Sequence, residues 1–334
     1  MTQPIGDLAQ FFATRTRVSQ AQAELQRTTG EVSSGIKDDI GASLKGDFSR
    51  LAAVERGLRL TESYVEGANL ANSYFAGMQS ALERAQSEVV ELGPRLIAAS
   101  GTGQTAQLTT TAIAAEDGFG QVVAALNAQI GGRSAFAGIA TNVIALTPAD
   151  DILADLETAL LGVVDAATMI TIVDSYFTDP GGGYETTAYQ GSATPRTGFT
   201  IGEGDVAESQ ITALDPAIRR TLSGLAMASL LSRGVGPFDA EGISELGRQA
   251  GEWMQEGYDA TTDLRSGLGV VEARVENALT RHRATQTALG IDRTNMVNTD
   301  PFEAAIELQA AETQLETLFL MTARLQRLTL AEYL

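Results

Sequence analysis

Two long stretches near opposite ends of the chain carry stripe residues at alternating spacings of four and three. The C-terminal stripe comprises Leu264, Leu268, Val271, Val275, Ala278, His282, Thr285 and Leu289. The N-terminal stripe comprises Leu51, Val54, Leu58, Thr61, Val65, Ala68, Asn72, Phe75, Gln79, Leu82, Gln86 and Val89. This spacing keeps one side of an α-helix facing a partner helix. We therefore predict a mainly α fold, a rod of long, coiled-coil-like paired N- and C-terminal helices. Two amphipathic core helices in an ordinary bundle are the alternative interpretation.

Local signals place further helices beyond these two stripes. A helix is expected over residues 15–33, and the long helix that follows is expected to end at Gly93-Pro94, a helix-stopping pair. The segment 298–301 interrupts the C-terminal pattern, with Asp300 as a good N-cap and Pro301 at the first helical position. A last helix should follow, carrying a stripe of Ile306, Leu315, Leu318, Leu325 and Leu328.

The middle of the chain, residues 142–234, has a different pattern. We expect helices over 149–166 and 216–231, separated by a Gly-rich turn at 179–183. Short strands are expected over 184–189, 196–201 and 206–213, because Gly and Pro separate short β-forming runs. We therefore predict that residues 142–234 form a small α+β insert in a helical chain.

Charge separates the middle of the chain from its ends. The formal net charge is −19, and residues 61–263 hold 26 acidic and 8 basic residues, so nearly all of it lies there. Proteins that bind nucleic acid need Lys and Arg to neutralise its phosphates, so nucleic-acid binding is not expected of this acidic chain. Near-neutral ends can pack against copies of themselves, whereas an acidic middle keeps an assembly soluble. A chance excess of acidic loops is the simpler explanation. No stretch predicts a membrane-spanning helix or a cleaved leader, so membrane insertion is not expected.

No pattern in the sequence nominates a catalytic, cofactor or metal site. His282 is the only histidine and there is no cysteine, which excludes thiolate zinc sites and a cysteine nucleophile. His282 lies on a predicted helix, where a seam or surface role is far more common than catalysis. The segment 101–106 lacks the preceding strand that a dinucleotide loop requires. We expect no enzyme and no cofactor.

Short motifs occur in a consistent order along the chain. They are Glu24-Leu25-Gln26 with Val32-Ser-Ser-Gly35, then Asp38-Asp39, Gly132-Arg-Ser-Ala-Phe-Ala-Gly138, Tyr189-Gln-Gly191-Ser192, Leu264-Arg265 through Gly269 to Arg274, and Leu328-Thr-Leu-Ala-Glu-Tyr333-Leu334. In order and spacing this set resembles the flagellin superfamily, and specifically its hook–filament junction branch. Two features depart from the family pattern: Ile40 stands where a proline often follows Asp-Asp, and the opening residues differ.

The resemblance implies an architecture, a role and partners. Residues 1–45 and 297–334 would form an inner polymerisation layer that orders on assembly, 46–141 and 235–296 a helical rod domain, and 142–234 an acidic outer domain. The protein would be a structural adaptor ring that joins the hook to the filament of the bacterial flagellum. Its partners would be copies of itself, a neighbouring hook-associated protein, flagellin, and an export chaperone on the C-terminal helix. It would be extracellular, exported by the flagellar type III apparatus without a cleaved signal peptide.

Apolar residues on the terminal helices are the predicted contacts between subunits. They are Val18, Leu25, Leu318, Leu325, Leu328, Tyr333 and Leu334. The alternative is that they pack only within one subunit. Two other functions also stay open: a flagellin that builds the filament itself, and an unrelated helical coiled-coil scaffold that shares only the heptad pattern.

Overall fold

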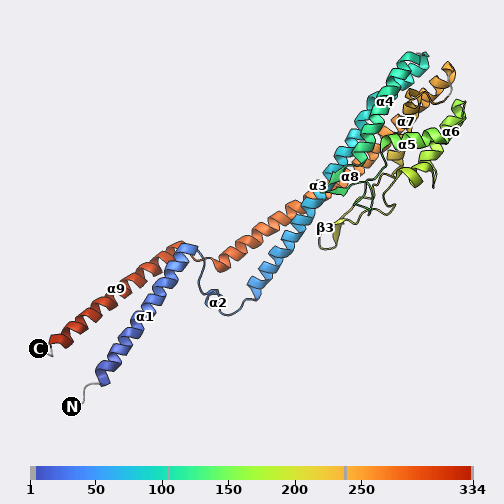
Figure 1. The fold of residues 1–334 in the computed structure, drawn as a ribbon. Coiled ribbons are helices and arrows are strands. Elements are labelled where there is room, and N and C mark those ends of the chain that lie inside the picture. Colours follow the sequence, from blue (N-terminus) through green and yellow to red (C-terminus); the bar gives the residue numbers. More distant parts are fainter. Residues whose placement is uncertain (1–4, 104, 237–238, 332–334) are drawn as a thin grey trace. The chain divides into compact units, whose positions relative to one another are not determined.

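The computed structural model describes residues 5–103, 105–236 and 239–331, and its fold is mainly α (Figure 1). The helices are α1 (Ile5–Ser34), α2 (Ile40–Ser43), α3 (Ser49–Thr102), α4 (Thr105–Leu126), α5 (Ala149–Ala159), α6 (Ala166–Thr178), α7 (Pro216–Ser232), α8 (Ala240–Val297) and α9 (Pro301–Ala331). Two antiparallel hairpins join β1 (Gln129–Ile130) to β2 (Arg133–Ser134) and β3 (Phe199–Gly202) to β4 (Asp205–Ala207). The predicted mainly α class with a small β-containing insert is confirmed.

The chain forms two compact units. Unit 1 consists of Met1–Glu62 and Ala284–Leu334, and unit 2 consists of Ser63–Arg283. Both boundaries fall inside long helices, α3 and α8. The three-part division expected from the sequence stays a prediction.

In unit 1, α1 lies beside α9 and the two helices run antiparallel (Figure 1). Their contact buries Ala21 and Thr28 of α1 and Ala304 and Ala311 of α9. Each pair is seven residues apart, which keeps both members on one side of its helix. The first residues of α3 and the last of α8 form a second small core around Val54, Met296 and Val297.

In unit 1, the segment that follows α1 is hydrogen-bonded to the segment where α8 ends and α9 begins. The amide of Lys37 donates to the carbonyl of Val297 over 3.0 Å, and the amide of Thr299 donates to the carbonyl of Gly35 over 3.1 Å. The predicted helix break at 298–300 is confirmed, because the Asp300 carboxylate accepts a 2.8 Å bond from an amide in the first turn of α9.

In unit 2, α3 continues through Pro94 to Thr102, so the predicted helix end at Gly93-Pro94 is wrong. The reason is packing. Gly93 is buried where α8 passes close by, and a Cβ there would lie 3.1 Å from the Gly251 carbonyl oxygen. Leu96, one turn further on, is fully buried. The helix is therefore kept by its neighbours despite a residue that removes one backbone hydrogen bond.

The polar seam residues of α3 contact one arginine of α8. Gln79 and Gln86 accept hydrogen bonds from the Arg265 guanidinium over 3.1 and 2.6 Å. Gln79 also donates to the Arg265 carbonyl, and Gln86 to the Tyr258 carbonyl. Asn72, the third amide of that stripe, is exposed. Because Arg265 lies between two amides one heptad apart, the pair fixes the register of α3 against α8.

The insert differs from its sequence prediction in three places. The helix expected over 149–166 is shorter than predicted: α5 ends at Ala159, Gly162 turns the chain with φ +83°, and a separate helix, α6, begins at Ala166. The expected strand over 184–189 contains a π-helix, η1 (Tyr184–Ala188). Tyr184 is fully buried and its hydroxyl donates to the Ala213 carbonyl over 2.7 Å. The remaining strands are shorter than expected, because only the residues beside the 203–204 turn pair.

Candidate interaction surface on the terminal helices

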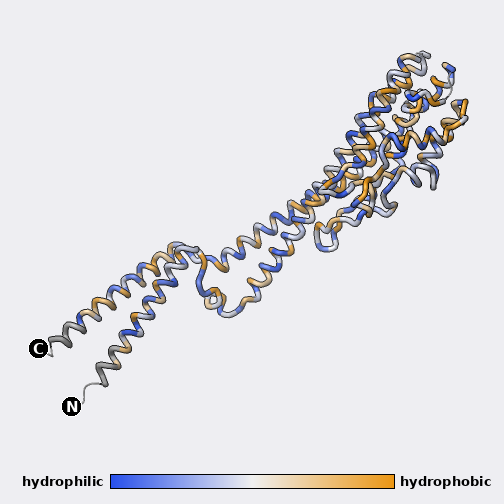
Figure 2. The backbone as a smooth tube through the Cα atoms, in the orientation of Figure 1, coloured by the Kyte–Doolittle hydropathy of each residue, from blue (hydrophilic) through white to orange (hydrophobic). Residues whose placement is uncertain are grey.

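The apolar side chains that the contact between α1 and α9 buries fully are small, and several large apolar side chains of α9 are exposed. Phe302 is 84% exposed, Ile306 68% and Leu320 59%. A helix turns by about 100° per residue, so these three lie on the side of α9 opposite Ala311, which faces α1. Apolar residues recur along the coloured part of α9 in Figure 2. We call Phe302, Ile306 and Leu320 the outward stripe.

A second apolar feature extends from Leu25 of α1 around α9 to Leu320, which it shares with the outward stripe. Leu25 of α1 and four residues of α9 form an apolar groove, and two carboxylates stand at its rim. The α9 residues are Leu315, Phe319, Leu320 and Ala323, and the rim residues are Glu312 and Glu316. We call it the acid-rimmed groove. Phe319 and Leu320 are each about half exposed, so the groove is open to solvent.

The predicted subunit contacts fall into two groups in the structure. Val18, Leu25 and Leu318 are half-buried on the helices that pair within unit 1. Leu325 and Leu328 belong to α9, but their side chains lie outside the described part of the chain. Tyr333 and Leu334 also lie outside the described residues. Whether any of these side chains contacts another subunit stays a prediction.

The sequence prediction of contact residues did not include four exposed apolar side chains of α9. Phe302, Phe319 and Leu320 were absent from it, and Ile306 was assigned only to the stripe of the last helix. The signal that could have found Phe302 and Leu320 is a second periodicity, since both fall on the helix side of Ile306 and away from Leu315 and Leu318.

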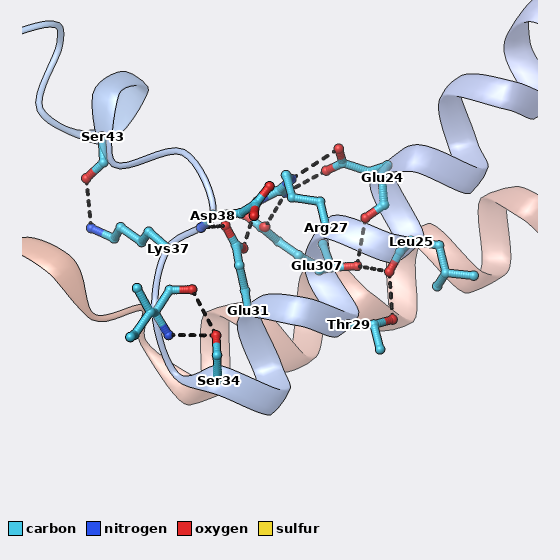
Figure 3. A network of polar contacts seen from close by, with 12 residues as sticks. Glu24, Leu25, Arg27, Thr29, Glu31, Ser34, Lys37, Asp38, Ser43 and Glu307 are labelled. Carbon is cyan, nitrogen blue, oxygen red and sulfur yellow. Dashed lines mark hydrogen bonds and ion pairs between the residues drawn. The ribbon is translucent and has the colours of Figure 1, made fainter.

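One arginine connects α1 to α9 beside the hydrogen-bonded connectors (Figure 3). The Arg27 guanidinium forms ion pairs with Glu24 at 2.6 Å, Glu31 at 2.7 Å and, across to α9, Glu307 at 3.0 Å. Hydrogen bonding from Arg27 lowers the pKa of Glu24, and the bond from Glu24 raises the already high pKa of Arg27. Glu31 is buried, and its second oxygen accepts from the Asp38 amide over 2.9 Å. The network therefore fixes α1 and the following connector to α9.

The one histidine of the sequence, His282, has a packing role in the structure. The Nε2 atom of His282 lies 2.7 Å from the Ile201 carbonyl oxygen, and its ring lies tilted against that of Tyr64 at 5.1 Å between centroids. The histidine therefore holds hairpin β3–β4 against α8. Within the described ranges, no group of three or more metal-binding side chains comes together. In that same part of the chain, no helix has the length and apolar character needed to cross a membrane.

Comparisons with known proteins agree with this architecture. Residues 253–334 match the family model of the bacterial flagellin C-terminal helical region. No curated protein matches the sequence. The fold is similar to the solved structure of a predicted flagellar hook-associated protein from Vibrio parahaemolyticus, with a TM-score of 0.52 and 12% sequence identity over 75% of this chain and 99% of that chain. At such low identity the likeness shows the fold.

Proposed function

We propose that this protein is a structural subunit of the bacterial flagellum and forms an adaptor ring between hook and filament. The outward stripe of α9 carries the proposal, because three large apolar side chains on a helix that already has a partner need a further surface to cover them. Copies of the same chain would supply this covering surface. The role is structural rather than catalytic, and the match over residues 253–334 favours it.

The junction role is the finer part of the proposal. It is favoured by the C-terminal Glu332-Tyr333-Leu334, which resembles the junction branch, and by the hook-associated protein with the similar fold. Its neighbours would be another hook-associated protein and flagellin, and an export chaperone would bind the C-terminal helix before assembly. The chain would be exported uncleaved to the extracellular flagellum. A flagellin that builds the filament itself is the second candidate, since residues 253–334 match flagellin's own C-terminal region.

Electron microscopy of the purified chain under salting-out conditions, with and without filament seeds, tests the role. An adaptor should give rings or short oligomers, and it should add to seeds without elongating into filaments. Long filaments from this chain alone would make it a flagellin. An unrelated scaffold should gain no helicity on assembly, whereas an inner layer that orders should do so in circular dichroism.

Paired variants test the surface itself. Ile306→Ser removes a large side chain from the outward stripe and should abolish assembly while the monomer keeps its helical circular dichroism. Leu161→Ser is the matched control, since Leu161 is 80% exposed but lies in unit 2, in the connection between α5 and α6. If assembly survives Ile306→Ser as well as it survives Leu161→Ser, the outward stripe is not part of the interface between copies.

A further inference from the structure

Hairpin β3–β4 lies where the large core of unit 2 ends. The buried residues of this core begin at Ala68 on α3 and end at Leu279 on α8. Over residues 280–295, all of which the structure describes, no residue of α8 is buried. Ile201 and Ala207 of the hairpin are fully buried and belong to the same core. The hairpin therefore closes this end of the core.

We propose that hairpin β3–β4 is a strap that keeps α3 and α8 together at the end of the core, and that strap and helix ends open together. Such opening is a local event that requires less free energy than global unfolding. An isolated two-stranded hairpin is at best marginally stable in water, so this one depends on the helices that it contacts. The helix ends depend on the hairpin in turn. The inference concerns a single chain and does not rest on the proposed function.

Two side chains of α8 hold the hairpin by its main chain. The Nε2 atom of His282 lies 2.7 Å from the Ile201 carbonyl oxygen of β3, and Nε2 is the donor because a carbonyl oxygen can only accept. The Arg274 guanidinium donates to the Val206 carbonyl of β4 over 2.5 Å and lies 3.7 Å from the Asp205 carboxylate. The two donors are about 12 Å apart along α8, at 1.5 Å per residue. Both strands of the hairpin are thus bonded to α8.

Helix α3 contacts the hairpin through a glycine and two aromatic rings. A Cβ at Gly67 would lie 2.2 Å from the Thr200 carbonyl oxygen, so the backbone of β3 lies directly against the helix. The Phe199 ring lies 5.4 Å from the ring of Tyr74 and 5.9 Å from that of Phe75, between centroids. The same hairpin therefore contacts both helices, α3 through close packing and α8 through hydrogen bonds.

Hydrogen exchange of the backbone amides in the full-length chain tests the strap, because exchange reports local opening of each segment. His282→Ala removes the donor to β3 and should raise exchange rates about five- to tenfold, both in residues 199–207 and in residues 275–283 of α8. His282→Gln keeps a side-chain N–H of similar reach and should restore much of the protection. Exchange in α7 is the internal reference, since unchanged protection there shows that a variant keeps its fold.

Gly67→Ala tests the contact with α3, and Gly269→Ala is the matched control. The first adds a Cβ that collides with β3, so it should release the hairpin even though alanine favours the helix. The second adds a Cβ to α8 where nothing lies within 4 Å, so exchange in the hairpin should not change.

The strap predicts that the hairpin and residues 275–283 exchange faster together, in His282→Ala and in Gly67→Ala alike. Faster exchange in the hairpin alone would overturn the proposal, because α3 and α8 would then stay paired without it. Unchanged exchange in both segments would overturn it as well, because the contacts of His282 and Gly67 would then not hold the hairpin in solution.

Discussion

Replacing Gly251 by alanine should destabilise unit 2, although the residue lies inside a helix. A Cβ at Gly251 would stand 2.7 Å from the Gly93 carbonyl oxygen of α3 and 2.7 Å from Ile97 Cγ1. Real Cβ atoms do not approach other atoms so closely, and the oxygen belongs to helix backbone, which can yield only if α3 moves. The two helices touch here backbone to backbone.

Two opposing effects determine how much Gly251→Ala changes the free energy of unfolding. Alanine in a helix interior gains about 0.5–1 kcal/mol over glycine, because the unfolded chain loses freedom. Overpacking a tight contact costs about 1–3 kcal/mol, and a clash with backbone belongs at the upper end. The net loss should therefore be about 1–2 kcal/mol. For a unit of this size that corresponds to a fall in Tm of roughly 2–8 °C.

Thermal unfolding followed by circular dichroism measures the effect, with Gly267→Ala as control. Gly267 lies in the same helix, α8, and a Cβ there would meet nothing within 4 Å. Its replacement should stabilise the protein by about 0.5–1 kcal/mol through helix propensity alone. The two variants should thus shift the Tm in opposite directions. If Gly251→Ala stabilises as much as Gly267→Ala does, the close contact between α3 and α8 does not exist in solution.

Three further outcomes are expected. Pro94→Ala should raise the free energy of unfolding by up to about 3 kcal/mol, since it restores a helical N–H donor, and denaturant titration would detect the change. Burial raises the pKa of Tyr189 to about 12, so its stabilising contribution should be complete below pH 10 and decline as pH rises from 10 to 12; absorbance titration of the folded protein should show a tyrosine that ionises near pH 12. The pKa of Glu24 is lowered from 4.5, so its pairing with Arg27 should stabilise α1 above that pH and weaken as pH falls through the lowered value, which hydrogen exchange in α1 would report.

The helices were predictable from sequence wherever the signal was local. The four-three spacing defines a helix side within a single segment, and Asp300-Pro301 carries its own cap chemistry, so the break between α8 and α9 was predicted correctly. Pro94 is the contrary case. The proline weakens the helix through its own backbone, and this effect can be read from the local sequence. The packing that outweighs it comes from α8, far away in the sequence, so the residues around Pro94 do not reveal it.

The interaction surface was harder to predict for a related reason. Apolar residues show that a helix has an apolar side, but they do not show which side its own chain will cover. In α9 the small residues Ala304 and Ala311 take the inner position, because small side chains let α1 approach closely. The large side chains of Phe302 and Ile306 are consequently left outside. A prediction that ranks residues by hydrophobicity alone reverses these roles.

The two units differ in how their helices are held, and this bears on assembly. In unit 2 a glycine contact and the bonds of Arg265 fix α3 against α8, around a large buried core. In unit 1 the contact between α1 and α9 buries alanines and a threonine, which contribute little apolar area, and its ion pairs are partly exposed and therefore weak. Leu25 and Leu318 are only half-buried there, and the outward stripe of Phe302, Ile306 and Leu320 is exposed. Covering that surface with another copy would add the stability that the single chain lacks, so the ordering of α1 and α9 should depend on assembly.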